Sequence, residues 1–372
     1  MKKLGLLVGI IMLITIFVGC GTGQVSEETL VPNEIVSSQT KDKEPGEEEA
    51  TKQENTVDKE EIETIEEEKS GQERYIKIKF DSQALKANKV GEKTEKEVCI
   101  YLPPSYFKSD KSYPVVYYLH GYMEHASTFV SGSKKQLDEA FKNGGKEFIL
   151  VGVNGLNQLG GSFYTNSPVS GNWEDYVVDE VVSLVDENFR TIKDGKARGI
   201  CGFSMGGYGA YNIAFKHPDV FGAMLTMSPG LIADGDLPAA LTTWQNDGAF
   251  KRAYSQAFSP NENDTKTYGN IPQLTGTTED NAIVADWENG FGNINQKVED
   301  YIALNNPLKA IKIVYGDRDN YDWIPRGCEF LSKSLDEHGI EHVSESFNGG
   351  HRMPSQVIEK YIVLFFNDNL VY

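Results

Sequence analysis

Hydrophobic and polar side chains follow two different patterns along the chain. Residues 74–80 (RYIKIKF) and 97–103 (EVCIYLP) alternate apolar and polar positions, which predicts an edge hairpin or a half-exposed sheet. Residues 113–121 (YPVVYYLHG) and 147–155 (EFILVGVNG) are continuous apolar runs, which are typical of strands covered on both faces in a parallel sheet. Further strands are predicted at 197–203, 221–229, 310–316 and 341–347.

Helical periodicity separates these strands. In residues 172–189, apolar side chains recur at helical spacing from Trp173 to Val185, which predicts a surface helix packed on the sheet. The alternation of strands and helices predicts an α/β fold, with a central, mostly parallel sheet and helices on both faces. Residues 230–308 lose this pattern over a length too great for an ordinary connection, so we expect an inserted helical cap there. Other helices are predicted at 134–144, 206–217, 328–339 and 354–366.

The first 20 residues have the features of a targeting signal. Residues 1–19 combine two lysines with an apolar run of about 15 residues, shorter than the ~20 that span a membrane, and are predicted to be a cleaved signal peptide. Residues 17–20 (FVGC) resemble a bacterial lipobox, which implies a lipidated Cys20. Acyl chains there would hold the protein on the extracellular face of the cell membrane. The alternative is an ordinary secretory signal followed by a chance cysteine.

Residues 20–72 form a polar, acidic segment. Within it, residues 26–70 contain 16 acidic and 5 basic residues and no aromatic residue, so no apolar surface offsets the entropy cost of ordering. We therefore predict a disordered linker, followed by one globular domain over residues 73–372. Of the total net charge of −19, residues 71–372 carry −10. This acidity argues against nucleic acid as a partner and against membrane contact other than through the lipid anchor.

Cysteine usage adds little to this picture. Beyond Cys20 the chain contains Cys99, Cys201 and Cys328, an odd number without the spacing of a metal site. One disulfide is compatible with this number, and three buried thiols are the preferred interpretation. The sequence does not indicate an oligomeric state.

Four glycines surround one serine in residues 201–210 (CGFSMGGYGA). The stretch Gly202-Phe203-Ser204-Met205-Gly206 fits the pattern G-x-S-x-G between a predicted strand and a predicted helix. At such a nucleophile elbow the serine projects from the carboxyl edge of the sheet, and the flanking glycines leave room for the sharp turn. The alternative is a glycine-rich helix start with a solvated serine. We predict that Ser204 is a nucleophile.

A serine nucleophile requires a base that accepts its proton. In α/β-hydrolase chain order the acid and the base follow the serine, which leaves His338, His342 and His351, with His217 less favoured. His338 lies near a predicted helix end and His342 within a predicted strand, as surface or packing histidines do. His351 follows the sequence FNGG directly after the last predicted strand, so it is the predicted general base.

The acid that orients this imidazole is expected after the strand at 310–316. The following residues offer Asp317, Asp319 and Asp322, of which Asp319 is preferred, and Asp317 has the alternative role of capping the turn. The D-x-D spacing also occurs in calcium loops, but the other ligands of such a loop are missing from the sequence. We expect neither a metal nor an organic cofactor.

Two backbone N–H groups are predicted to stabilise a tetrahedral intermediate. One belongs to Met205, directly after the nucleophile, and the other to Tyr122, in the loop after the strand at 113–121. The alternative is that His120 and Gly121 merely end this strand.

Four separated segments, YYLHGY, GFSMGGYGA, GDRD and NGGH, together with NWEDYVVDEVVSLVDENFRT, resemble the esterase D family of α/β-hydrolases. That family includes feruloyl and acetyl-xylan esterases, S-formylglutathione hydrolases and mycolyltransferases. The likeness covers about residues 97–366. It implies an α/β-hydrolase fold in which Ser204 is the nucleophile, Asp319 the acid and His351 the base, with Tyr122 and Met205 at the oxyanion positions.

These observations predict an extracellular, lipid-anchored serine carboxylesterase. The external location and the resemblance favour feruloyl or acetyl esters of plant polysaccharides, or short-chain or aryl esters. The alternatives are acyl transfer to a sugar or lipid acceptor, and a catalytically silent surface-binding lipoprotein that keeps the fold. Four aromatic residues are candidates for stacking on the substrate, although core packing is their more common role: Trp244, Trp287, Phe291 and Trp323.

Overall fold

The computed structural model describes residues 73–372. The predicted signal peptide, Cys20 and the acidic segment up to residue 72 lie outside the described residues. Within the part that is described, no helix is both long and apolar enough to cross a membrane.

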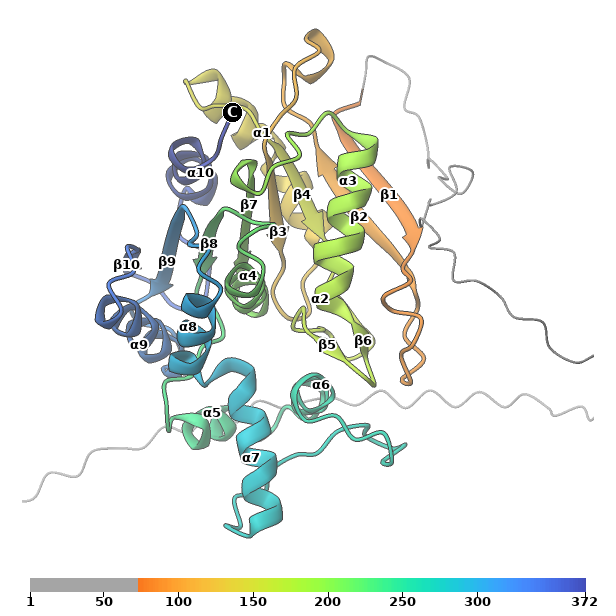
Figure 1. Ribbon diagram of the computed structural model, residues 1–372, viewed down its shortest axis with the longest axis vertical. Helices are drawn as coiled ribbons and strands as arrows, with labels where there is room; N and C mark the ends of the chain where they lie inside the picture. Colours follow the sequence, from red (N-terminus) through yellow and green to blue (C-terminus); the bar gives the residue numbers. More distant parts are fainter. Residues whose placement is uncertain (1–72) are drawn as a thin grey trace, which may run out of the picture. The chain divides into compact units, whose positions relative to one another are not determined.

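An eight-stranded sheet forms the centre of the molecule, in the order β1-β2-β4-β3-β7-β8-β9-β10 (Figure 1). β1 and β2 pair antiparallel as an edge hairpin, and β2 is antiparallel to β4, while all other neighbours are parallel. The predicted α/β fold with a mostly parallel sheet is therefore confirmed. The strands are β1 (Tyr75–Asp81), β2 (Glu95–Tyr101), β3 (Val115–Leu119), β4 (Ile149–Val153), β7 (Arg198–Phe203), β8 (Ala223–Met227), β9 (Ala310–Gly316) and β10 (Val343–Phe347).

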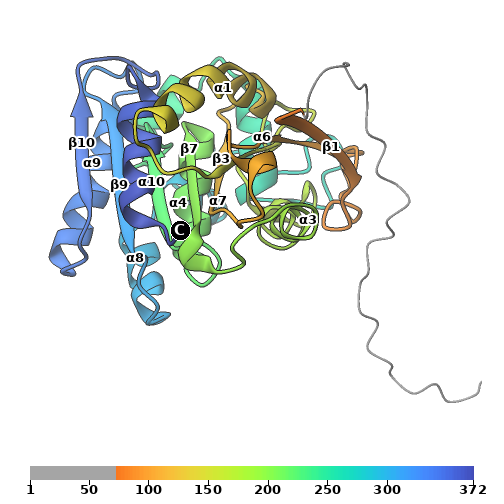
Figure 2. The same cartoon turned by 90° about the horizontal axis from the view of Figure 1, so that it is seen from above.

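Helices cover both faces of this sheet. One face packs against α1 (Ala126–Lys142), the π-helical η4 (Val357–Val363) and α10 (Leu364–Asn369). The other packs against the continuous helix of α2 (Trp173–Asp175), the π-helical η2 (Tyr176–Val181) and α3 (Val182–Asn188), and against α4 (Met205–Lys216) and α9 (Trp323–Glu337). In Figure 2, α1 and α3 lie on opposite sides of β3. The two layers explain why the central strands are apolar on both faces.

The segment from 230 to 308 contains four helices: α5 (Leu237–Thr243), α6 (Gly248–Phe258), α7 (Thr278–Phe291) and α8 (Ile294–Ala303). Figure 1 shows α5, α6 and α7 beyond one end of the sheet, whereas α8 lies beside it. α8 packs against α4 and α9, so it belongs to the helical layer. The separate group of helices is therefore α5 to α7, which is shorter than the predicted cap.

Short elements complete the fold. The two-residue strands β5 (Asn166–Ser167) and β6 (Gly171–Asn172) form a hairpin that no sequence pattern predicts, because two residues show no periodicity. Single 3₁₀ turns are η1 (Tyr106–Lys108) and η3 (Gly195–Ala197). The thiols of Cys99, Cys201 and Cys328 are free and buried, which confirms the preferred interpretation. Burial raises the pKa of the Cys99 thiol to about 11.

Candidate active site

Ser204 lies at a sharp turn between β7 and α4. Its backbone has φ of 55° and ψ of −117°, a conformation that is costly for a residue with a Cβ. Its N–H donates to the carbonyl of Met227, at the end of the neighbouring strand β8, at 3.0 Å. The strand, the turn and the helix therefore have the arrangement expected of a nucleophile elbow.

The glycines on either side of Ser204 make this turn feasible. A Cβ on Gly202 would lie 2.1 Å from the carbonyl oxygen of Gly206, and a Cβ on Gly206 would lie 2.0 Å from the carbonyl oxygen of Leu119. Both obstacles are backbone atoms, which cannot rotate away. The chain therefore needs glycine at both positions so that α4 can start directly against β3 and β7.

Replacing Gly206 with alanine is expected to lower the free energy of unfolding by about 4 kcal/mol, because the backbone of β3 must move to admit the methyl group. Urea denaturation followed by circular dichroism measures this loss. Gly132→Ala is the matched control, since a Cβ on this helical glycine meets no atom within 4 Å. Equal stability of the two variants would contradict the proposed packing at the elbow.

The imidazole of His351 bridges the serine and a carboxylate. Its Nε2 lies 2.9 Å from Ser204 Oγ, and its Nδ1 lies 2.7 Å from Asp319 Oδ2. The His351 side chain is 16% exposed and that of Asp319 is fully buried. The ring packs beside Phe203, with centroids 5.0 Å apart, and is nearly perpendicular to that of Tyr321, with centroids 5.1 Å apart. The structure thus brings together three side chains that are 32 and 147 positions apart along the chain.

The loop that carries His351 is held by the residues after β9. Asp317 Oδ1 accepts from the N–H of Gly349 at 3.1 Å, and the N–H of Arg318 donates to the carbonyl of Gly349 at 2.9 Å. Gly316 allows this close approach, because a Cβ there would lie 2.5 Å from the carbonyl oxygen of Gly349. The loop that carries Asp319 and the loop that carries His351 therefore hold each other in place.

The other candidate acids point elsewhere. Asp317 binds the backbone of Gly349, and Asp322 forms an ion pair with Arg326 at 2.9 Å. Asp319 is the one that faces His351, and its second oxygen accepts from the N–H of Tyr321 at 2.9 Å. Among residues 73–372, no group of three or more His, Cys, Asp or Glu side chains is arranged to hold a metal ion.

The other candidate bases are also engaged away from Ser204. His217 contacts the carboxylate of Glu174, and His342 lies 2.6 Å from the hydroxyl of Ser332. His338 Nδ1 lies 2.8 Å from the carbonyl of its own helix at Ser334. An open groove near His342, at the amino-terminal ends of β9 and β10, is at the opposite edge of the sheet from Ser204.

Tyr122 and Met205, the two predicted oxyanion residues, lie against the same loop. The N–H of Met205 is the first of α4 and has no partner within the helix. Tyr122 follows β3, and its hydroxyl donates to the carbonyl of Leu159. At Gly161 a Cβ would lie 2.2 Å from Met205 Sδ and 2.9 Å from Tyr122 Cδ2. The loop after β4 therefore contacts both side chains.

His120 is a residue that sequence analysis missed. The histidine is fully buried, and its Nδ1 lies 2.7 Å from the carbonyl of Gly121, while the N–H of Gly155 donates to its Nε2 at 2.9 Å. Burial lowers the pKa of His120 to about 4, so the imidazole is neutral at pH 7. It joins the loop of Tyr122 to the loop after β4. No local pattern indicates this role, since Gly155 is 35 positions away.

Aromatic contacts link the loops around Ser204 to the helices α5 and α6. The four aromatic candidates for substrate stacking (Trp244, Trp287, Phe291 and Trp323) are all buried and form part of the core. Three other rings are half-buried: Tyr321 contacts His351, and Tyr122, which follows β3, contacts Phe250 at a centroid distance of 5.0 Å. These rings, unlike the four buried ones, keep part of their surface accessible.

Residues 91–326 match the family model described as "Putative esterase". This match spans more than half of the chain. The chain belongs to this esterase family. The resemblance seen in the sequence is thereby confirmed at the level of the family.

Two bacterial proteins are similar to this chain over part of their length. Esterase Rv1288 of Mycobacterium tuberculosis is 32% identical over 127 residues, which cover 32% of this chain and 26% of that protein. An endo-1,4-beta-xylanase/feruloyl esterase of Xylanibacter ruminicola is 31% identical over 138 residues, covering 35% of this chain and 19% of that protein. The chain thus spans about a quarter of the length of the first relative and about a fifth of the second.

A solved structure of a ferulic acid esterase superposes with a TM-score of 0.56 and 22% identity, covering 79% of this chain and 97% of that one. At this level of identity the likeness concerns the fold. It agrees with the α/β-hydrolase architecture of the sheet and its helices.

Proposed function

We propose that this protein is a serine carboxylesterase with Ser204 as nucleophile, His351 as general base and Asp319 as the acid that orients the imidazole. The observation that carries the proposal is the continuous path of two short contacts, from Asp319 to His351 at 2.7 Å and from His351 to Ser204 at 2.9 Å. Membership of the esterase family supports the same reaction type.

The proposed reaction has two steps. His351 Nε2 accepts the proton of Ser204 as its Oγ attacks the ester carbonyl, and the imidazolium then donates a proton to the departing alcohol. A water molecule, activated by the same nitrogen, releases the acid from the acyl-enzyme. Backbone N–H groups of Met205 and Tyr122 donate to the oxyanion in both steps, and a donor of this kind is worth ~3 kcal/mol. The buried carboxylate of Asp319 stabilises the transient imidazolium.

The proposed substrates are feruloyl or acetyl esters of plant polysaccharides, or related short-chain or aryl esters. Two of the similar proteins are an endo-1,4-beta-xylanase/feruloyl esterase and a ferulic acid esterase. The half-buried rings of Tyr122, Phe250 and Tyr321 offer flat apolar surface on which an aromatic acyl group can stack. Of the proposed classes, this favours an aryl acyl group.

A substrate panel tests this function. The purified full-length protein is assayed with methyl ferulate, acetylated xylan, p-nitrophenyl acetate and a thioester, and is treated with a fluorophosphonate probe that labels activated serines. Hydrolysis of methyl ferulate and covalent labelling are expected, with the thioester cleaved slowly. His351→Ala is expected to abolish both signals, whereas His338→Ala, which alters a histidine bound to its own helix, retains them. Absence of hydrolysis and of labelling in the unaltered protein would reject the proposal.

The proposed location is the extracellular face of the bacterial membrane, with residues 1–19 removed and Cys20 lipidated ahead of the acidic segment. The motif FVGC supports this proposal. Cells fed labelled palmitate are expected to label the protein, and Cys20→Ala to remove the label and release the protein into the medium. Unchanged palmitate labelling of Cys20→Ala would contradict the lipid anchor.

A further inference from the structure

Two oppositely charged side chains outside the proposed triad are almost completely buried. Glu92 precedes β2 and Lys96 lies within it. Their side chains are 6% and 5% exposed, and Lys96 Nζ lies 2.6 Å from Glu92 Oε1. The ammonium also lies 4.7 Å from the ring centroid of Trp173. A buried ion pair stabilises a protein little more than apolar residues of the same size, so its contacts with the backbone are the informative feature.

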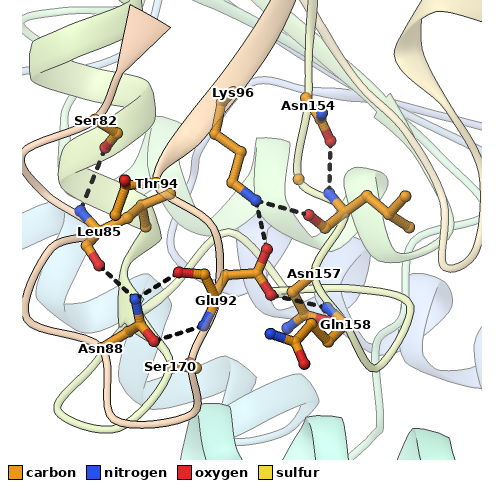
Figure 3. A network of polar contacts seen from close by, with 12 residues as sticks. Ser82, Leu85, Asn88, Glu92, Thr94, Lys96, Asn154, Asn157, Gln158 and Ser170 are labelled. Atoms are coloured by element: carbon orange, nitrogen blue, oxygen red, sulfur yellow. Dashed lines mark hydrogen bonds and ion pairs between the residues drawn. The ribbon is translucent and has the colours of Figure 1, made fainter. Parts of the chain in front are cut away.

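The pair supplies partners for main-chain groups of the loop at 154–161, which follows β4. Lys96 Nζ donates to the carbonyl of Leu156 at 3.3 Å, and Glu92 Oε2 accepts from the N–H of Gln158 at 2.9 Å (Figure 3). Both are hydrogen bonds in which one partner is a charged side chain that is itself almost completely buried. The pair therefore fixes the outer side of this loop.

Glu92 is itself held in place. The side chain of Asn88 donates to the carbonyl of Glu92 at 3.0 Å and accepts from its N–H at 2.8 Å (Figure 3). The same amide donates to the carbonyl of Leu85 at 2.8 Å. These three bonds fix the turn between β1 and β2, so the carboxylate is presented from a rigid support.

The inner side of the loop contacts both residues proposed to bind the oxyanion. The carbonyl of Leu159 accepts from the hydroxyl of Tyr122. The backbone of Gly161 lies so close to Tyr122 and Met205 that a Cβ would overlap both side chains. A shift of the loop at 154–161 therefore displaces the residue whose N–H is one of the two oxyanion donors.

We propose that Glu92 and Lys96 are positioning residues, which hold the loop at 154–161 so that Tyr122 and Met205 stand at the spacing needed to bind the oxyanion. This inference rests on the proposed function. Donors must lie about 2.7–3.1 Å from the position that the oxyanion occupies, and a contact made only in the transition state raises kcat without changing substrate binding. Loss of the pair is therefore expected to lower kcat and to leave KM unchanged.

The double variant Glu92→Leu/Lys96→Met tests this role. It removes both charges at similar volume and leaves no unpaired buried charge. Its Tm is expected to stay near that of the unaltered protein, while kcat for p-nitrophenyl acetate falls about 10-fold and KM changes less than about twofold. The matched control is Lys77→Met/Glu97→Leu, which removes a partly exposed pair, 2.9 Å apart, between β1 and β2. The control is expected to keep its kcat.

A second readout separates positioning from general destabilisation. A trifluoromethyl ketone forms a tetrahedral adduct on an activated serine, and its inhibition constant is expected to rise by the same factor by which kcat/KM falls. Should the double variant fail to fold, Glu92→Gln/Lys96→Met takes its place: it leaves no buried charge and loses the hydrogen bond from Lys96 Nζ to the carbonyl of Leu156, so kcat is still expected to fall. Unchanged kcat and inhibition constant in a folded variant overturn the proposal, as does a fall in activity that only tracks the loss of folded protein. An unaltered protein without activity would instead contradict the proposed function.

Discussion

Ser204→Ala is expected to lower kcat for p-nitrophenyl acetate by about a million-fold, to the level left when a catalytic serine is removed from a serine hydrolase. The alanine keeps the Cβ at φ of 55° and removes only the hydroxyl that contacts His351 at 2.9 Å. The Tm is therefore expected to remain within a few degrees of the starting value. Stopped-flow and long-time assays of the purified variant, with a fluorophosphonate labelling gel, measure the loss.

The matched control for this variant is Ser228→Ala. Ser228 follows β8 as Ser204 follows β7, has φ of 39°, and is buried with a hydroxyl that has no hydrogen-bond partner among the described residues. It shares the positive φ at the carboxyl edge of the sheet but forms no hydrogen bond with His351. Its kcat is expected to be unchanged. Substantial activity in Ser204→Ala, beyond the uncatalysed rate, would show that another group is the nucleophile.

Asp319→Asn is expected to lower kcat by about 10⁴-fold, because it changes which nitrogen of His351 carries the proton. The N–H of Tyr321 donates to Oδ1 of Asp319, so the asparagine oxygen must take that place and its NH₂ must face His351 Nδ1. Nδ1 is then obliged to accept, and the ring proton moves to Nε2. A protonated Nε2 can no longer accept the proton of Ser204.

Asp317→Asn is the control for this exchange. Its amide oxygen still accepts from the N–H of Gly349, so the loop of His351 keeps its position and kcat is expected to change less than about threefold. Steady-state kinetics of both variants, with circular dichroism to check folding, make the comparison. Equal kcat in Asp319→Asn and in the unaltered protein would remove Asp319 from the proposed mechanism.

Strong local patterns were sufficient for most of the elements. The continuous apolar runs predicted β3 and β4, because a strand covered on both faces shows its burial in every residue. α1 was predicted only from residue 134, whereas it begins at Ala126. Its first two turns (residues 126–133) mix Ala126, Phe129 and Val130 with five serine, threonine and glycine residues, so their apolar pattern is weak. They become helical by packing on β4, where Gly152 leaves room for Ala126 and Val130.

The sequence by itself determined the position of the sharp turn at Ser204. Only glycine fits on either side of that turn, because a Cβ there would collide with backbone atoms. Only the tertiary structure decided which of three aspartates faces His351, and that His120 and Lys96 contact the loop at 154–161, at Gly155 and Leu156. The physical reason is the distance along the chain over which each kind of interaction acts. Backbone strain and periodic burial act between neighbours in the chain, whereas these contacts join residues 32, 35 and 60 positions apart, which only the order of the strands brings together.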